Sequence, residues 1–212
     1  MRIESGQRLV MIGDSITDCG RARPIGRPGG LGSGYVHFVY ALIAARYPDR
    51  IVEVLNTGIS GNRVTDLRGR WDTDVLALHP DWLSIMIGIN DVWRHYDSPF
   101  NTPQVSIGEY ESILEDLVVR TQPTVQGLVL MTPYFIEANR RDPMRAEMDQ
   151  FGEVVRRLAR KHKTVFVDTQ AAFDAYLAHR PTQTLCGDRV HPNDIGHMIL
   201  AKAFLNGIGF EW

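Results

Sequence analysis

Five short hydrophobic runs recur along the chain, separated by longer amphipathic or polar stretches. Each run is apolar at successive positions, which is typical of a parallel strand covered by helices on both faces. The pattern therefore predicts strands over Arg8–Ile12, Ile51–Leu55, Trp82–Ile87, Gly127–Met131 and Thr164–Val167.

Three kinds of helix signal occur between these strands: amphipathic spacing, a serine–glutamate capping box, and a proline or polar cap at the start. They predict helices over residues 35–47, 106–121 and 143–161, and two more with N-caps at Thr169 and Asn193. Strands that alternate with helices indicate an α/β domain with a mostly parallel sheet.

Chemically distinctive residues follow three of the predicted strands. The first strand ends in Gly13-Asp14-Ser15, the second precedes Gly58-Ile59-Ser60-Gly61-Asn62, and the third ends in Gly88-Ile89-Asn90-Asp91. Ligands of open α/β sheets bind at the carboxyl ends of the strands. We therefore expect a serine, a glycine-rich turn and an asparagine at one rim.

Acyl transfer needs a nucleophile, a base, a group that orients the base, and donors for the oxyanion. Ser15, the Gly61 backbone and the Asn90 amide are suited to the first and last roles. Asp188 and His191 lie three apart on a predicted loop, where the carboxylate can bind one ring nitrogen and leave the other free. Taken singly, each residue also fits a helix cap, a turn or a surface loop.

The combination and order of these segments resemble the four sequence blocks of the SGNH (GDSL-type) hydrolase family. The resemblance spreads over almost the whole chain and implies one domain, residues 1–212, folded as a three-layer α/β/α sandwich with a central five-stranded, flavodoxin-like sheet. It implies Ser15 as nucleophile, His191 as base and Asp188 as the third triad member. Ser15, Gly61 and Asn90 become the oxyanion hole, with no metal or organic cofactor.

Longer strings around these blocks are similar to the acetyl xylan esterase branch of the family: residues 13–23, 56–62, 85–93 and 168–173. This similarity implies a small acetylated carbohydrate, such as an acetylated xylo-oligosaccharide, as substrate, and a homo-oligomeric enzyme. Short-chain lipases and thioesterases of the same family remain the alternative.

Residues next to the blocks are the expected substrate contacts: Asp14, Asn62, Arg63, Trp93 and Arg94. Polar donors beside an aromatic face match sugar hydroxyls and the apolar face of a pyranose ring. The competing interpretation is that Trp93 packs in the core and Arg94 is solvated.

Two hypotheses from other classes use overlapping residues. A metal-dependent phosphoesterase would use carboxylates and imidazole at the strand ends, namely Asp14, Asp18, Asn90, Asp91 and His191. A carbohydrate-binding domain would stack sugars on Trp71, Trp93 and Tyr96, but it leaves the nucleophile and base unexplained.

Composition limits the binding partners and the cellular location that we expect. The net charge of −2 gives no support to a nucleic acid or an anionic membrane as partner. Cys19 and Cys186 form no CxxC pair, and the residues from Met1 to Gly13 lack a signal-peptide pattern. We therefore expect a cytoplasmic protein. The C-terminal segment, Gly207–Trp212, is expected to pack on the domain's own core, with a subunit contact as the alternative.

Overall fold

The structure is a computed structural model that describes residues 1–98 and 100–212. Its strands and helices alternate along the chain as the hydrophobic pattern predicts. In chain order they are β1 (Arg8–Gly13), α1 (Ser15–Asp18), α2 (Tyr35–Arg46), β2 (Glu53–Asn56), α3 (Val64–Asp74), η1 (Leu76–Leu78), β3 (Trp82–Met86), α4 (Ile89–Asp97), α5 (Ile107–Thr121), η2 (Gln122–Thr124), β4 (Gly127–Met131), α6 (Pro143–His162), β5 (Val165–Val167), α7 (Thr169–Leu177), η3 (Thr182–Thr184) and α8 (Asp194–Gly207).

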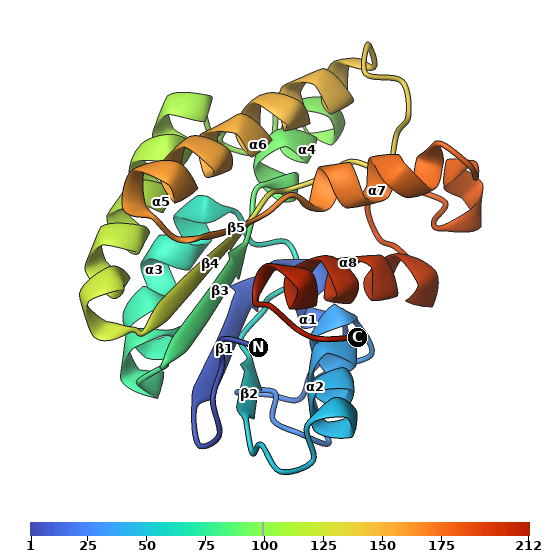
Figure 1. The fold of residues 1–212 in the computed structure, drawn as a ribbon. Coiled ribbons are helices and arrows are strands. Elements are labelled where there is room, and N and C mark those ends of the chain that lie inside the picture. Colours follow the sequence, from blue (N-terminus) through green and yellow to red (C-terminus); the bar gives the residue numbers. More distant parts are fainter. Residues whose placement is uncertain (99) are drawn as a thin grey trace.

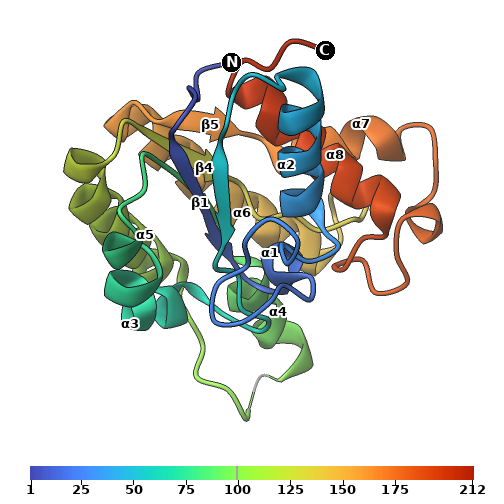
Figure 2. The ribbon, with the colours of Figure 1, turned by 90° about the horizontal axis from the view of Figure 1, so that it is seen from below.

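A five-stranded sheet in the order β2-β1-β3-β4-β5 forms the middle layer, and all of its pairs are parallel. Helices α2 and α8 pack on each other and cover one face, where α2 meets β2 and α8 meets β5. Helices α3, α5 and α6 cover the other face (Figures 1 and 2). This arrangement confirms the predicted three-layer sandwich and its flavodoxin-like strand order.

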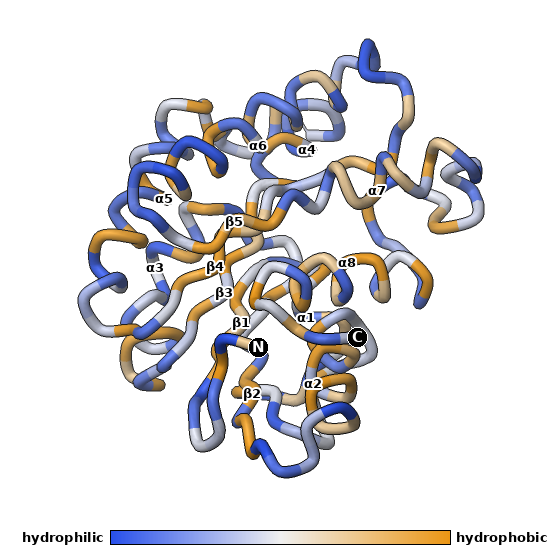
Figure 3. Tube along the Cα trace, in the orientation of Figure 1, coloured by the Kyte–Doolittle hydropathy of each residue, from blue (hydrophilic) through white to orange (hydrophobic). Residues whose placement is uncertain are grey.

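The core lies between these layers, and the most hydrophobic stretches of the chain follow the strands (Figure 3). In β1, the four residues from Leu9 to Ile12 are fully buried. A strand buried on both faces needs apolar side chains at successive positions, which is why the runs do not alternate with polar residues.

The register aligns the carboxyl ends of four strands. Gly13 of β1 pairs with Met86 of β3, which pairs with Met131 of β4, which pairs with Val167 of β5. The segments that follow these residues therefore leave the sheet at one edge, and that edge holds the candidate site.

Two local predictions need correction. Ile51 lies outside β2 and is 78% exposed, and its N–H donates to the Ser5 hydroxyl and not to a neighbouring strand. The N-cap of α7 is Asp168, whose carboxylate accepts from the Ala171 N–H. Thr169 is the first helical residue, and its buried hydroxyl donates to the Thr132 carbonyl.

Other boundaries are confirmed to within one or two residues. Ser106 and Asn193 cap α5 and α8 as predicted, and Pro143 is the first residue of α6. Helices α3 and α4, by contrast, occupy segments in which no helix was predicted from the sequence.

In the C-terminal segment, Phe210 is buried against Tyr47, whereas Trp212 remains 58% exposed.

Candidate active site

The turn from β1 into α1 positions Ser15. Asp14 caps α1 by accepting a hydrogen bond from the Ile16 N–H at 3.0 Å, and Ser15 is the first residue of the helix. A Cβ at Gly13 would lie 2.3 Å from the Thr17 hydroxyl and 2.4 Å from the Met86 carbonyl, so the turn leaves no room for a side chain. Ser15 is thereby held, partly exposed, at the carboxyl edge of the sheet.

Ser15, His191 and Asp188 form a continuous hydrogen-bonded chain. The Ser15 Oγ lies 2.8 Å from His191 Nε2, and His191 Nδ1 lies 2.7 Å from Asp188 Oδ2. With a proton on Nδ1 held by the carboxylate, Nε2 is the nitrogen that can accept the serine proton. The structure thus brings together two segments that are 176 residues apart in the sequence.

Asp188 is suited to remain ionised. Partial burial raises its pKa, but hydrogen bonds from the His191 ring and from the N–H groups of His191 and Val190 outweigh burial, so the pKa lies below its usual value. A charged Asp188 can hold the ring orientation and stabilise an imidazolium when one forms.

The loop that carries Asp188 and His191 is tied to the segment after β4. Arg189 has a left-handed backbone (φ 65°), which costs strain in a residue with a Cβ. Its carbonyl accepts from the Ile136 N–H, and its guanidinium binds Glu137 and Asp142. These contacts stabilise the turn that directs His191 towards Ser15.

The glycine-rich turn after β2 packs directly on α1. A Cβ at Gly58 would lie 2.3 Å from the Asp18 nitrogen, and the Ser60 N–H and hydroxyl both donate to the Asp18 carboxylate. Gly61 is exposed and has φ 82°, a conformation that favours glycine. Apart from its two chain neighbours, no atom of the described residues lies within 4 Å of a Cβ built at Gly61, so this backbone borders open space.

Asn90 lies in the first turn of α4 and is almost fully buried. Its Nδ2 donates to the Asn62 carbonyl at 3.0 Å, which links this helix to the Gly61 turn. One of its two N–H bonds is thereby used, and the other has no partner among the residues that the structure describes.

Arg70 is a site residue that the sequence did not reveal. From α3 it donates to the carbonyls of Gly13 and Thr57 and to the Asn62 side chain, so it joins the two loops beside Ser15. Its signal was hidden because the mostly polar sequence of α3 gave no helix prediction to place it. A guanidinium has several N–H donors in one rigid plane, which suits it to bridging two loops.

The five expected substrate contacts have different surroundings. Asp14 is buried beneath the turn, which does not support a direct contact with substrate. The Asn62 side chain is bound to Arg70, and Arg63 donates to the Pro103 carbonyl. Trp93 is partly exposed, and its ring lies 5.8 Å from the His191 ring. Arg94 turns back towards Asn90, with Nη2 3.3 Å from Oδ1.

A cavity of about 240 Å³ opens beside the triad. It combines an aromatic wall with charged groups, and the triad aspartate forms part of it. The lining residues are Trp93, Tyr96, Asp97, Phe135, Asp142, Pro143, Met144, Asp188 and Arg189.

The structure weakens the two hypotheses from other classes at specific residues. Among the described residues, no cluster of three or more His, Cys, Asp or Glu side chains is arranged to hold a metal ion. Asp18 is already bound to Arg23 and Ser60. Trp71 is fully buried with its Nε1 on the Thr121 hydroxyl, so it offers no stacking surface.

Beneath the site lie two buried carboxyl groups. Burial raises the pKa of Asp14 to about 7 against the opposing hydrogen bond from the Ile16 N–H, and the charge of Asp91 adds to the rise. Burial likewise raises the pKa of Asp91 to about 7 against the hydrogen bond from the Val64 N–H. Both carboxyl groups therefore hold a proton to a higher pH than an exposed aspartate does.

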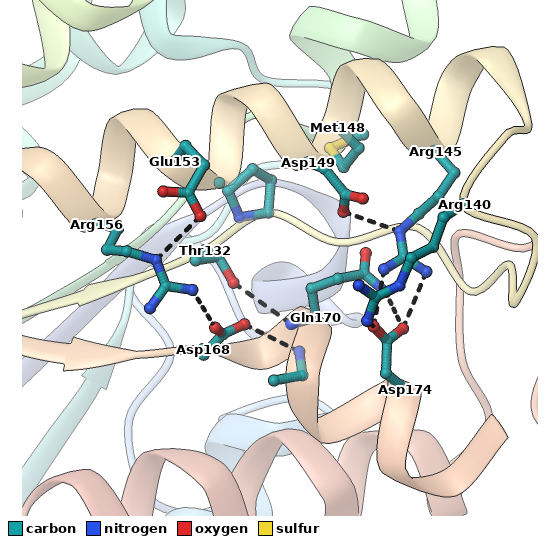
Figure 4. Close-up of a pocket in the computed structure, with 13 residues that line it drawn as sticks. Thr132, Arg140, Arg145, Met148, Asp149, Glu153, Arg156, Asp168, Gln170 and Asp174 are labelled. Atoms are coloured by element: carbon teal, nitrogen blue, oxygen red, sulfur yellow. Dashed lines mark hydrogen bonds and ion pairs between the residues drawn. The ribbon is translucent and has the colours of Figure 1, made fainter. Parts of the chain in front are cut away.

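A second charged cavity, of about 220 Å³, lies between α6 and α7 (Figure 4). Arg145 binds Asp149 and makes a two-bond pair with Asp174, and Arg156 binds Glu153 and Asp168. Its charged groups thus bind one another rather than projecting free into the cavity.

Within the described residues, no helix is long and apolar enough to cross a membrane.

Comparison with known proteins gives a consistent result over the whole chain. The model of the GDSL-like Lipase/Acylhydrolase family matches residues 11–199. An acetylxylan esterase of Geobacillus stearothermophilus is 56% identical over 215 residues, which cover 100% of this chain and 98% of that protein. The crystal structure of that organism's Axe2, an acetylxylan esterase, matches with a TM-score of 0.98 at 56% identity, covering 100% and 98% of the two chains.

Three further Axe2 structures are described as catalytic mutants, with alanine in place of the serine at position 15, of an aspartate, or of a histidine three residues after that aspartate. The same spacing separates Asp188 from His191. LAE5, an alpha/beta hydrolase enzyme from the metagenome of Lake Arreo, Spain, is 49% identical with a TM-score of 0.94, covering 99% and 98% of the chains. With its whole length matched in sequence and fold, the chain belongs to the GDSL-like lipase/acylhydrolase family.

Proposed function

We propose that this protein is a serine esterase that removes acetyl groups from acetylated carbohydrates, with xylo-oligosaccharides as the substrate class. The observation that carries the proposal is the chain from Ser15 Oγ through the His191 ring to Asp188, with links of 2.8 and 2.7 Å. The 56% identity to an acetylxylan esterase supports the choice of substrate.

In the proposed mechanism, Ser15 Oγ attacks the ester carbonyl carbon while His191 Nε2 takes its proton. The resulting oxyanion is stabilised by the N–H groups of Ser15 and Gly61 and by the free N–H of the Asn90 amide. His191 then protonates the leaving sugar oxygen, which gives an acetyl-enzyme. Water activated by the same histidine releases acetate and restores Ser15.

The cavity beside Asp188 is the proposed place for the sugar. Trp93 and Tyr96 offer aromatic faces to a pyranose ring, and the cavity wall also carries the charged groups of Asp97, Asp142 and Arg189, which are paired with neighbouring charges. A long aliphatic chain would meet these charged groups instead of a continuous apolar groove, which favours a sugar over a lipid.

Chain-length dependence tests the substrate class. We expect kcat/KM to fall from p-nitrophenyl acetate to butyrate and octanoate, together with acetate release from acetylated xylo-oligosaccharides. An extended apolar pocket would instead gain about 0.8 kcal/mol for each further buried methylene. A maximum at octanoate without acetate release from the sugar would indicate a lipase or thioesterase.

Localisation and assembly complete the proposal. Cys19 and Cys186 are both free thiols, as suits a reducing compartment, so we place the enzyme in the cytoplasm. We also propose that it works as a homo-oligomer. Cell fractionation and light scattering of the purified protein test these two points, and a secreted or monomeric enzyme would contradict them.

A further inference from the structure

Asn90 and Arg94 lie one turn apart on the same face of α4, where side chains at positions i and i+4 meet. Arg94 Nη2 donates to Asn90 Oδ1 at 3.3 Å, while Asn90 Nδ2 donates to the Asn62 carbonyl at 3.0 Å. Both the oxygen and the nitrogen of the amide are therefore hydrogen-bonded. The partner at each end can bind only the atom that lies there, the oxygen at one end and the nitrogen at the other.

The orientation of this amide matters because its two ends have nearly the same shape. A half-turn of the Asn90 side chain would exchange its oxygen and nitrogen, and the exchanged oxygen would repel a developing oxyanion. Arg94 has only donors, so it binds Oδ1 and disfavours Nδ2. The Asn62 carbonyl has only acceptor sites, so it imposes the same choice from the other end.

Arg94 is itself held in place. Its Nη1 is paired with Asp97, and its guanidinium lies 4.8 Å from the centroid of the Trp93 ring. With one nitrogen on Asp97 and another on Asn90, the side chain is directed into the oxyanion machinery rather than out to a sugar. Its positive charge also polarises the Asn90 amide, which strengthens the remaining N–H as a donor.

We propose that Arg94 is a positioning residue that fixes the Asn90 amide with its nitrogen towards the oxyanion. The inference rests on the proposed esterase function and changes the role expected of Arg94 from a substrate contact to a support of catalysis. It acts through Asn90, so its effect belongs to kcat and is the same for esters with and without a sugar.

The test compares R94M, R94K, N90A and the double variant on p-nitrophenyl acetate and on acetylated xylo-oligosaccharides. We expect R94M to lower kcat about 10- to 100-fold on both esters with KM within about twofold, in line with the loss of one charged hydrogen bond. R94K should recover part of the loss. Because Arg94 acts through Asn90, adding R94M to N90A should cost little more.

Arg120→Met is the matched control, because Arg120 has similar exposure to Arg94 and pairs with Asp72 and Asp116 on helices α3 and α5. It should leave kcat unchanged, and thermal melting of each variant checks folding. A loss confined to KM and to the oligosaccharide would assign Arg94 to sugar binding and overturn the proposal, as would additive losses in the double variant. Failure of the esterase proposal looks different, because the wild-type protein would then hydrolyse neither ester.

Discussion

Two charge-rich regions lie at the same edge of the sheet, and they differ in what their polar groups leave unused. In the cavity between α6 and α7, Arg145 and Arg156 are neutralised by neighbouring carboxylates (Figure 4). In the triad, by contrast, Ser15 is partly exposed and the His191 side chain is 44% exposed, and the hydrogen bond between them is one that a substrate can replace.

The difference distinguishes polar groups that stabilise the fold from polar groups that can act on a substrate. A closed ion-pair network holds helices in register and offers no group to an incoming molecule. The catalytic rim uses equally polar residues, but the Gly61 backbone borders open space and Asn90 keeps one free N–H. Charge alone therefore does not mark a functional site; unused hydrogen-bonding capacity next to a cavity does.

Ser15→Ala should show the largest effect. It removes the attacking oxygen of a partly exposed residue, so esterase activity should fall by about 10⁴-fold or more while the melting temperature changes little. Steady-state rates with p-nitrophenyl acetate and a thermal melt measure both. Retention of a tenth of the wild-type rate would exclude Ser15 as nucleophile.

Asn90→Ala should lower kcat by about 10² to 10³-fold with a much smaller change in KM. The lost N–H is expected to bind charge that develops only in the transition state. Separate determination of kcat and KM on the same ester decides the matter. A change in KM alone would mean that Asn90 binds the ground state of the substrate.

Arg145→Met tests the closed network. Arg145 is 2% exposed, and its loss removes the ion pair with Asp149 and leaves Asp174 with Arg140 and Gln170 alone. We expect about 2 to 3 kcal/mol of lost stability, less than for a fully buried pair because Asp174 is partly exposed. Urea unfolding measures it, and kcat of the folded variant should stay unchanged.

Arg140→Met is the control for the closed network, because Arg140 also binds Asp174 but is 74% exposed. Its loss should cost less than about 1 kcal/mol. Equal costs for the two variants would show that burial of the guanidinium does not matter here.

Asp14→Asn should give a subtler effect, on the pH dependence of stability. The pKa of Asp14 is about 7 in the folded protein and 3.8 without the influence of the fold, so between these values the folded state binds the extra proton. The free energy of unfolding therefore falls as pH rises from about 4 to 7, by up to about 1.4 kcal/mol per pH unit for each such carboxyl.

Asp91 adds a second contribution of the same sign, because its pKa is also raised to about 7. Asn cannot titrate, so the variant should show a shallower fall in urea midpoints between pH 4 and 7. Stability that rises over this range would contradict the raised pKa values. Below pH 4 the lowered pKa values of Asp18 and Asp188 act in the opposite direction.

The sequence predicted best those site residues whose place follows from a predicted strand. Ser15 and Asn90 follow buried strands directly, so the strand prediction alone placed them at one rim. The roles of Arg70 and Arg94 were missed because they depend on helices α3 and α4, which were not predicted. The α3 segment is mostly polar, whereas the α4 segment has apolar residues at helical spacing that were not recognised as a helix. Without α4, the four-residue spacing from Asn90 to Arg94 carried no meaning, and Arg94 was assigned to the substrate instead.

The Ser15–His191 contact also determines when a newly synthesised chain can become active. At ~5–20 residues per second, translation of the 176 residues between them takes roughly 10–35 s. Throughout that interval the nucleophile has been synthesised but has no base, and α8, which packs on α2, has not been made. A chain that stops before His191 is thus chemically inert, and hydrolytic competence arrives only after His191 has been made.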